Sequence, residues 1–310
     1  MKQYFEVEVN KYVPGDKRVI VRPASLNHPK DNAVMFVTES FVKYANALME
    51  CRDCLVFWPD TVDVPAEIDE RHAVCKVNDP HKEFARFFSN NHISYLPNMD
   101  EYEIVNGAYI AKGAVIGANC RIFPGAYIGG EVEIGDHVYI GSGVKLIGEV
   151  HIGNHVIIRE NTVIGADSMT TDRDSDGTPL TIPQFGSVVI EDYVQIGANS
   201  VVSRGAIDET RICYGAKIDN EVFVSHNVCV GKESFVIGST HMMGSSSVGE
   251  QAQISGGCLL NNYVHIGDRT LLGMCSLANK SIPGDVIAYG SPAKVVRYQP
   301  GYLPKTESED

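Results

Sequence analysis

The chain has 310 residues, of which 44% are apolar, and a formal net charge of −13. This length and apolar content can fill a substantial core and leave room for two domains. The acidic balance disfavours nucleic acid as the main partner. The N-terminal stretch MKQYFEVEVNKY has acidic residues where a signal peptide needs an apolar core, and no apolar run approaches the length of a membrane span. We therefore expect a soluble, cytoplasmic protein.

Residues 1–100 predict a small α/β domain. Strands are predicted within YFEVEV, RVIVRPA, NAVMFVTE and CLVFWPD, where apolar residues alternate or run together. Helices are predicted for SFVKYANALME and DPHKEFARFFSNN, the second with Asp79 as N-cap and Pro80 at its first position. No glycine-rich phosphate loop follows a strand, which argues against a nucleotidyltransferase domain.

The cysteines do not predict a disulfide framework, because we expect a reducing compartment for this chain. Cys51 and Cys54 form a Cys-x2-Cys pair, yet no second pair has the matching spacing of a structural zinc site. We interpret both as ordinary reduced thiols and predict no metal.

Residues 101–285 repeat with a period of six. Steps of six from Ile104 meet Ile or Leu at every position down to Ile164, and the period later resumes from Ile212 to Leu272. Helical periodicity of about 3.6 cannot keep this register. A large aliphatic residue every six positions, with a small or β-branched residue four later, is the hexapeptide pattern of a parallel β-helix. We predict about eight coils of three hexapeptides, followed by a C-terminal tail over 286–310.

Two interruptions break the period. Residues 166–187 form a polar excursion loop that we assign to the β-helix domain. Within it, DRDSDG resembles the start of a calcium-binding loop, but Pro183 occupies the position of the essential bidentate Glu. We predict a solvated turn there. The second interruption, SRGAIDET, lies one coil before His226.

His226 stands two residues after the inward-pointing Val224 and should face outward near a corner. Adding one 18-residue coil places Gly244 above it, and subtracting one places Asp208 below it if the interruption preserves the stacking. An imidazole beside a carboxylate can act as a general base, and the glycine offers space and a backbone N–H as oxyanion donor. These parts suit acyl transfer; an ordinary surface histidine is the alternative.

Three other histidines raise the question of a metal site. His137 and His155 are one coil apart, with His151 close by in sequence. The γ-class carbonic anhydrases bind zinc between subunits of this fold, but their His-x4-His spacing is absent here. We predict no metal at this position either.

The run from GAD through IPQFGSVVIEDYVQIGANSVVSRGAIDET to IDNEVFVSHNVCVG resembles the UDP-3-O-acylglucosamine N-acyltransferases of lipid A biosynthesis. The resemblance implies a left-handed β-helix, a homotrimer and no permanently bound cofactor. By position, it implies that His226 is the general base, Asp219 its carboxylate partner and Gly244 the oxyanion donor. Asp208 remains the geometric alternative to Asp219.

The resemblance extends to NDPHKEFARFF and to NAVMFVTESFVKYANAL, which matches the family segment whose aromatic residues hold the uracil. Phe36 matches the first of these aromatic residues, and Tyr44 is the candidate for the second, with a longer spacing than in the family. Asn227, beside the histidine, is assigned to substrate binding. The implied acceptor is a nucleotide-linked amino sugar.

The C-terminal part departs from this family. LLNNYVHIGD offers Asn262 and Tyr263 where a second histidine is expected, so we assign Asn262 to donor binding. The carrier-protein-binding helices of the family have no counterpart in the fourteen residues after Val296. Instead, IPGDVIAYGSPAKVVR resembles the ending of coenzyme A-dependent hexapeptide acetyltransferases, in which Lys294 and Arg297 would meet phosphates.

We therefore predict N-acylation of a nucleotide-linked amino sugar by acyl-CoA, for a surface polysaccharide, with O-acylation less favoured. One alternative is the lipid A enzyme with acyl carrier protein as donor. The other is a non-catalytic nucleotide-sugar-binding scaffold.

Overall fold

The computed structural model describes residues 2–94 and 100–299. No helix among these described residues is long and apolar enough to cross a membrane. Contacts divide the chain into two compact units, each described by itself. The N-terminal unit comprises Met1–Leu96, Met169–Phe185 and Ala206–Asp208, and the solenoid unit comprises Pro97–Ser168, Gly186–Gly205 and Glu209–Asp310.

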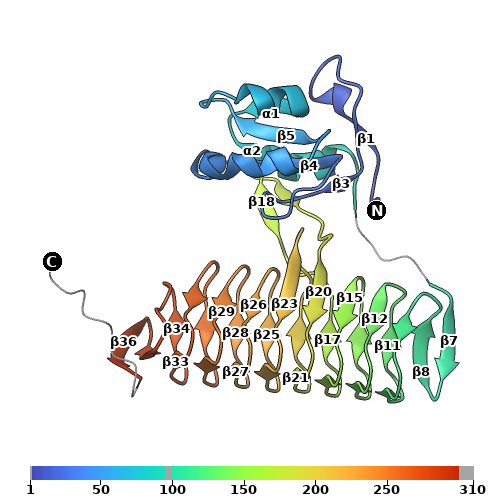
Figure 1. Cartoon of the computed structure of the whole chain (residues 1–310), viewed down its shortest axis with the longest axis vertical. Coiled ribbons are helices and arrows are strands. Elements are labelled where there is room, and N and C mark those ends of the chain that lie inside the picture. Colours follow the sequence, from blue (N-terminus) through green and yellow to red (C-terminus); the bar gives the residue numbers. More distant parts are fainter. Residues whose placement is uncertain (1, 95–99, 300–310) are drawn as a thin grey trace. The chain divides into compact units, whose positions relative to one another are not determined.

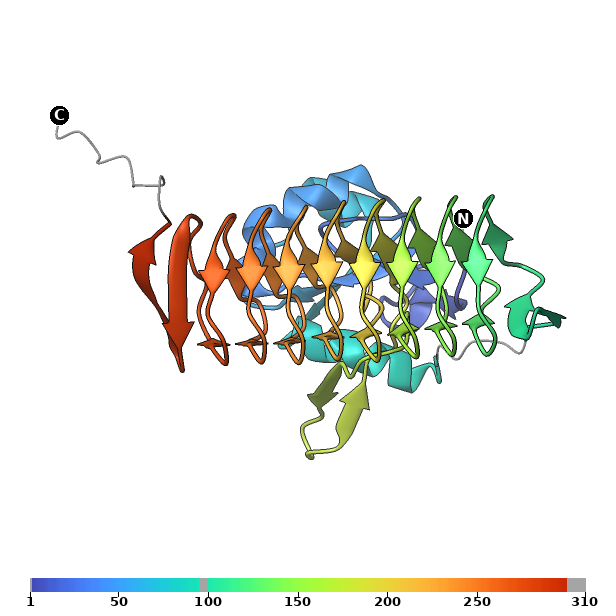
Figure 2. The same ribbon diagram turned by 90° about the horizontal axis from the view of Figure 1, so that it is seen from below.

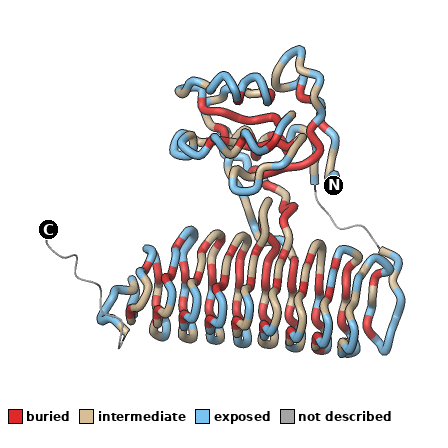
Figure 3. The backbone as a smooth tube through the Cα atoms, viewed as in Figure 1, coloured by how far each residue is buried: buried red, intermediate tan, exposed pale blue. Residues whose placement is uncertain are grey.

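A four-stranded parallel sheet in the order β3–β4–β5–β6 forms the centre of the N-terminal unit (Figures 1 and 3). Strand β5 is buried along its whole length, which explains its unbroken apolar sequence. The strands are β1 (Val7–Glu8), β2 (Val19–Ile20), β3 (Arg22–Pro23), β4 (Ala33–Phe36), β5 (Leu55–Pro59), β6 (Ala73–Val77), β18 (Thr171–Arg173) and β19 (Pro179–Thr181). The helices are η1 (Val9–Lys11), η2 (Glu39–Glu50), α1 (Ala66–Arg71) and α2 (Pro80–Asn90).

The predicted helix at the end of this unit is confirmed as α2. The carboxylate of Asp79 accepts a hydrogen bond from the Lys82 N–H at 3.1 Å, and Pro80 opens the helix. The other predicted helix, η2, is a 3-10 helix, and α1 and β6 were not predicted.

The excursion loop does not stay with the coils. Residues Met169–Phe185 belong to the N-terminal unit, where β18 and β19 form an antiparallel hairpin. Leu180 and Phe185 are buried in the same core cluster as Phe88 of α2. These apolar side chains give the loop a core to join, so assigning the whole of 166–187 to the β-helix domain was wrong.

The solenoid unit has three faces, and within each face the strands of successive coils pair in parallel (Figures 1 and 2). The first face contains β7 (Tyr102–Val105), which is antiparallel to its neighbour, then β8 (Ala108–Ala111), β11 (Tyr127–Ile128), β14 (Lys145–Leu146), β17 (Val163–Ile164), β22 (Val201–Val202), β25 (Phe223–Val224), β28 (His241–Met242), β31 (Leu259–Leu260) and β34 (Leu277–Ala278). The second contains β9 (Val115–Ile116), β12 (Val132–Ile134), β15 (Val150–Ile152), β20 (Ser187–Ile190), β23 (Glu209–Ile212), β26 (Cys229–Val230), β29 (Ser247–Val248) and β32 (His265–Ile266). The third contains β10 (Arg121–Ile122), β13 (Tyr139–Ile140), β16 (Ile157–Ile158), β21 (Gln195–Ile196), β24 (Lys217–Ile218), β27 (Phe235–Val236), β30 (Gln253–Ile254), β33 (Leu271–Leu272), β35 (Val286–Gly290) and β36 (Ala293–Tyr298).

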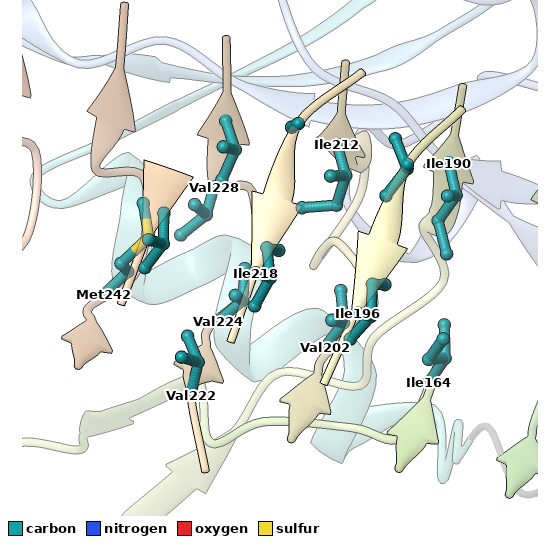
Figure 4. Close-up of a cluster of buried hydrophobic side chains, with 14 of the residues drawn as sticks. Ile164, Ile190, Ile196, Val202, Ile212, Ile218, Val222, Val224, Val228 and Met242 are labelled. Atoms are coloured by element: carbon teal, nitrogen blue, oxygen red, sulfur yellow. The ribbon is translucent and has the colours of Figure 1, made fainter. Parts of the chain in front are cut away.

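The repeated aliphatic residues fill the inside of this prism, as predicted. Ile164, Val202 and Val224 stack from coil to coil on the first face, and all three are fully buried (Figure 4). The eight strands of the second face correspond to the predicted eight coils. Burial in Figure 3 alternates along each coil, because alternate residues of a strand point inward.

Both interruptions occur at one corner of the prism, where the first face turns into the second. We call it the first corner. Val201 pairs with Phe223, 22 residues on, whereas Phe223 pairs with His241, 18 residues on. The four extra residues leave the coil between β22 and β23, and Ala206–Asp208 belong to the N-terminal unit. The predicted stacking of Asp208 on His226 assumed no insertion and is therefore wrong.

The segment predicted as a tail, from residue 286, begins with two strands. Strand β35 continues the third face in parallel, and β36 turns back to pair with β35 in antiparallel fashion. This hairpin ends the third face (Figure 2).

Candidate active site

His226, Gly244 and Asn262 lie at the first corner on three successive coils. The Ser245 N–H donates to the His226 carbonyl at 2.9 Å, and the Tyr263 N–H donates to the Gly244 carbonyl at 3.2 Å. The stacking of Gly244 on His226, expected from the 18-residue period, is present. The three residues therefore share one edge of the solenoid.

The imidazole of His226 lies directly against Gly244. A Cβ atom at position 244 would stand 2.4 Å from Nε2 and 2.5 Å from Cε1 of His226, far inside any ordinary contact. Only glycine leaves the ring where it is. Because β25 ends at Val224, the half-buried His226 falls in the turn, with its ring outside the aliphatic core.

The other ring nitrogen is held by the next residue along the chain. Nδ1 of His226 lies 3.1 Å from Oδ1 of Asn227, an acceptor that favours the tautomer with its proton on Nδ1 and a lone pair on Nε2. Asn227 adopts a φ of 58°, which asparagine tolerates better than most residues, and its N–H donates to Oγ1 of the buried Thr210 at 2.9 Å. The sequence reasoning gave Asn227 to the substrate and missed Thr210.

The two predicted aspartates lie elsewhere. Asp219 sits at the corner before β25, and its carboxylate accepts from the Gly238 N–H at 3.1 Å. In the N-terminal unit, the Asp208 carboxylate accepts from Oγ of Ser25 at 2.7 Å and lies 3.2 Å from Nδ1 of His28. Within residues 2–94 and 100–299, the His226 ring is therefore hydrogen-bonded to an amide oxygen and not to a carboxylate.

The backbone at Gly244 suits an oxyanion. Its N–H makes no hydrogen bond within residues 2–94 and 100–299, although the N–H groups of Met243 and Ser245 on either side both do. A base nitrogen and a free N–H therefore stand side by side. This pair can take a proton from a nucleophile and stabilise a negative oxygen.

The predicted nucleobase-stacking residues lie in the N-terminal unit. Phe36 ends β4 half-buried, with its ring 5.2 Å from that of His81 and 5.0 Å from that of Phe84. Tyr44 lies on η2 with 55% of its surface exposed, 5.9 Å from the ring of Phe41. The Tyr44 ring is the more exposed of the two, although the Lys43 ammonium lies over it at 4.9 Å from its centroid, whereas Phe36 is partly covered by its neighbours.

The predicted donor-binding residues fall into two groups. Asn262 is exposed at the first corner, two coils from His226. Lys294 and Arg297 are exposed on β36, opposite Tyr289 and Ile287 of β35.

The acidic residues of the excursion loop bind side chains. Oδ2 of Asp172 lies 2.9 Å from Nδ1 of His81, and Oδ1 of Asp174 accepts from Nε of Arg86 at 3.1 Å. Hydrogen bonding to Arg86 lowers the pKa of Asp174 to about 2. These contacts use the carboxylates that a calcium ion would need.

The histidines considered for metal binding form a ladder. The rings of His137 and His155 are parallel within 2°, with centroids 4.9 Å apart, and Tyr193 continues the stack at 4.9 Å. The lone pair of an imidazole lies in its ring plane, so parallel, displaced rings cannot both direct a lone pair at one ion. His137 and His155 therefore stack on each other and are not arranged as ligands of one metal ion.

The fold is of the class of left-handed β-helices built from hexapeptide repeats. Residues 113–148 and 131–166 match the family model described as "Bacterial transferase hexapeptide (six repeats)". Among solved structures, a UDP-N-acetylglucosamine acyltransferase from Bacteroides fragilis superposes with a TM-score of 0.58 at 25% identity, covering 65% of this chain and 79% of the other. The corresponding enzyme from Campylobacter jejuni, at 20% identity and a TM-score of 0.55 over 63% and 75% of the two chains, supports the fold alone.

Within this class, the chain is similar to the UDP-3-O-acylglucosamine N-acyltransferases. The enzyme of that name from Coxiella burnetii is 36% identical over 126 residues, 41% of this chain and 37% of the relative. That from Wolinella succinogenes is 35% identical over 135 residues, 44% of this chain and 42% of the relative. A Francisella tularensis enzyme is 49% identical over 79 residues, 26% and 23% of the two chains. The matched regions thus span less than half the length of these curated relatives.

Proposed function

We propose that the chain is an N-acyltransferase that moves an acyl group from a thioester to the amine of a UDP-linked 3-O-acylglucosamine. The observation that carries the proposal is the pairing of an unprotonated Nε2 on His226 with the free N–H of Gly244. The similarity to N-acyltransferases of that name supports the acceptor.

In the proposed reaction, the acceptor amine attacks the carbonyl carbon of the thioester while Nε2 of His226 takes the amine proton. The carbonyl oxygen becomes negative and accepts a hydrogen bond from the Gly244 N–H. The tetrahedral intermediate then collapses to the amide and expels the thiolate, which takes the proton from the imidazolium. Asn227 accepts from Nδ1 throughout and so stabilises the charged ring.

For the donor, we place acyl carrier protein ahead of the acyl-CoA predicted from the sequence. The prediction of coenzyme A rested on the departure of the C-terminal part from that family and on the ending GSPAKVVR, which places Lys294 and Arg297 on the terminal hairpin. The similarity to named UDP-3-O-acylglucosamine enzymes instead favours the alternative reading, in which a carrier protein delivers the acyl group. The proposed assembly is a homotrimer, in which a neighbouring subunit closes the outward-facing site around His226.

The test is an acyl-transfer assay in which UDP-3-O-acylglucosamine is the acceptor. The donor is either acyl carrier protein that bears an acyl group or acyl-CoA. His226→Gln should reduce the rate by about 10²–10⁴, because the variant lacks a base of comparable strength. The matched control is His241→Gln, which changes an exposed histidine on β28. Absence of transfer from both donors, with binding of the nucleotide sugar retained, would favour the scaffold alternative. A faster reaction with acyl-CoA would reverse our donor assignment.

A further inference from the structure

Two thiols and an imidazole that play no part in the proposed reaction meet inside the N-terminal unit. Cys51 follows η2, Cys54 precedes β5, and His72 follows α1. Each offers one ligand atom within 4.8 Å of those of the other two. Their exposed fractions are 1%, 0% and 2%. The sequence shows only the Cys-x2-Cys pair, and the fold adds a third side chain from 18 residues further on.

We propose that Cys51, Cys54 and His72 bind a zinc ion. The two sulfur atoms lie 3.7 Å apart. Tetrahedral zinc, with Zn–S bonds of about 2.3 Å, holds two thiolates about 3.8 Å apart. The sulfur atoms are therefore already spaced as ligands. Two thiolates also neutralise the charge of Zn²⁺, so the buried site would carry no net charge.

The hydrogen bonds of His72 prepare one nitrogen for the metal. Nε2 lies 2.9 Å from the Leu48 carbonyl oxygen, to which it donates. A histidine that binds zinc through one nitrogen usually donates its other N–H to such an acceptor. Nδ1 is left with a lone pair, which accepts only a long bond, 3.3 Å, from the Cys54 N–H.

Backbone oxygens can complete the coordination. The carbonyl oxygens of Lys30 and Arg52 lie 3.2 Å and 3.3 Å from Sγ of Cys54, and the single thiol proton can be donated to one of them at a time. Zinc would replace the two thiol protons, which leave to solvent as the ion enters. A carbonyl released in this way is available as a fourth, oxygen ligand.

The test is a Co²⁺ titration of the reduced full-length chain, followed by addition of Zn²⁺. We expect sulfur-to-cobalt charge-transfer absorption that saturates at one ion per chain and disappears when Zn²⁺ is added. Cys54→Ser should weaken binding at least a hundredfold. The matched control, Cys75→Ser, alters a half-buried thiol on the neighbouring strand β6 and should leave binding unchanged.

A second measurement does not depend on how the variants fold. In the wild-type chain, Zn²⁺ should slow the alkylation of Cys51 and Cys54 at least tenfold and leave that of Cys75 unchanged, as read by mass spectrometry. The proposal is overturned if the reduced chain shows no charge-transfer absorption, or if Zn²⁺ protects all three thiols equally. Neither measurement uses a substrate, so failure here is distinct from failure of the proposed acyl transfer.

Discussion

Replacing Gly244 by alanine tests the geometry on which the proposed reaction depends. The new methyl carbon would start 2.4 Å from Nε2 of His226, whereas an ordinary contact begins near 3.4 Å. The ring must therefore move by about 1 Å, and a misplacement of that size can reduce a rate by about 10². This corresponds to about 2.7 kcal/mol of lost transition-state stabilisation, at about 1.36 kcal/mol for each factor of ten. Alanine keeps the backbone N–H, so the oxyanion donor is retained.

The assay is kcat for acyl transfer, measured with the midpoint of thermal unfolding. Gly256→Ala is the matched control, because the nearest heavy atom to its new Cβ is 3.3 Å away and lies at another corner. We expect the Gly244 variant to lose about 10² in kcat with an unfolding midpoint close to that of the control. If the Gly244 variant folds as stably as the wild type and keeps its kcat, the position of the His226 ring does not govern the reaction, and the proposed mechanism is wrong.

Three further outcomes follow from the contacts described. Asn227→Asp should move the acidic limb of the pH–rate profile to higher pH. A carboxylate beside Nδ1 favours the imidazolium, and His226 can act as a base only when it is unprotonated. An unchanged profile would show that Asn227 plays no part in catalysis. The hydrogen bond from Arg86 lowers the pKa of the Asp174 carboxyl to about 2. The stability that this carboxylate gives to the β18–β19 hairpin should therefore be complete above pH 3.8, the ordinary pKa of the group, and should be lost as the pH falls through about 2. Carboxyl NMR titration would check this directly, and a midpoint at the ordinary value would contradict it. A hydrogen bond with the Cys213 thiol lowers the pKa of the Cys229 thiol, so iodoacetamide labelling of Cys229 should require higher pH in Cys213→Ala. An identical labelling curve would show that the contact is absent.

The sequence predicts the solenoid well because its information is local and periodic. Each coil repeats the same inward positions, so Ile164 and Val224 can be assigned to the core by counting. The capping role of Asp79 is equally local, since the carboxylate meets an N–H three residues away. Counting also places Gly244 against His226, because no insertion lies between them.

Counting fails where residues leave the coil. Four extra residues after β22 shift the register, so Asp208 lies in the N-terminal unit, bonded to Ser25. Sequence reasoning expected a carboxylate beside the His226 ring, whereas the structure places the amide oxygen of Asn227 3.1 Å from Nδ1. Likewise, no pattern links His72 to Cys54, because their approach depends on the packing of three separate elements.

The β35–β36 hairpin at the end of the third face has a consequence for aggregation between separate molecules. A stack of parallel strands about 4.8 Å apart has the same repeat as an amyloid fibril, and an open end is a template on which further strands can add. Strand β36 runs antiparallel to the stack, so it does not present the next rung of the parallel ladder. It also carries Lys294 and Arg297 at the edge, and charges on an edge strand oppose pairing with another molecule. Independently of any ligand that they bind, these two cations would oppose the end-to-end association of solenoids into fibres.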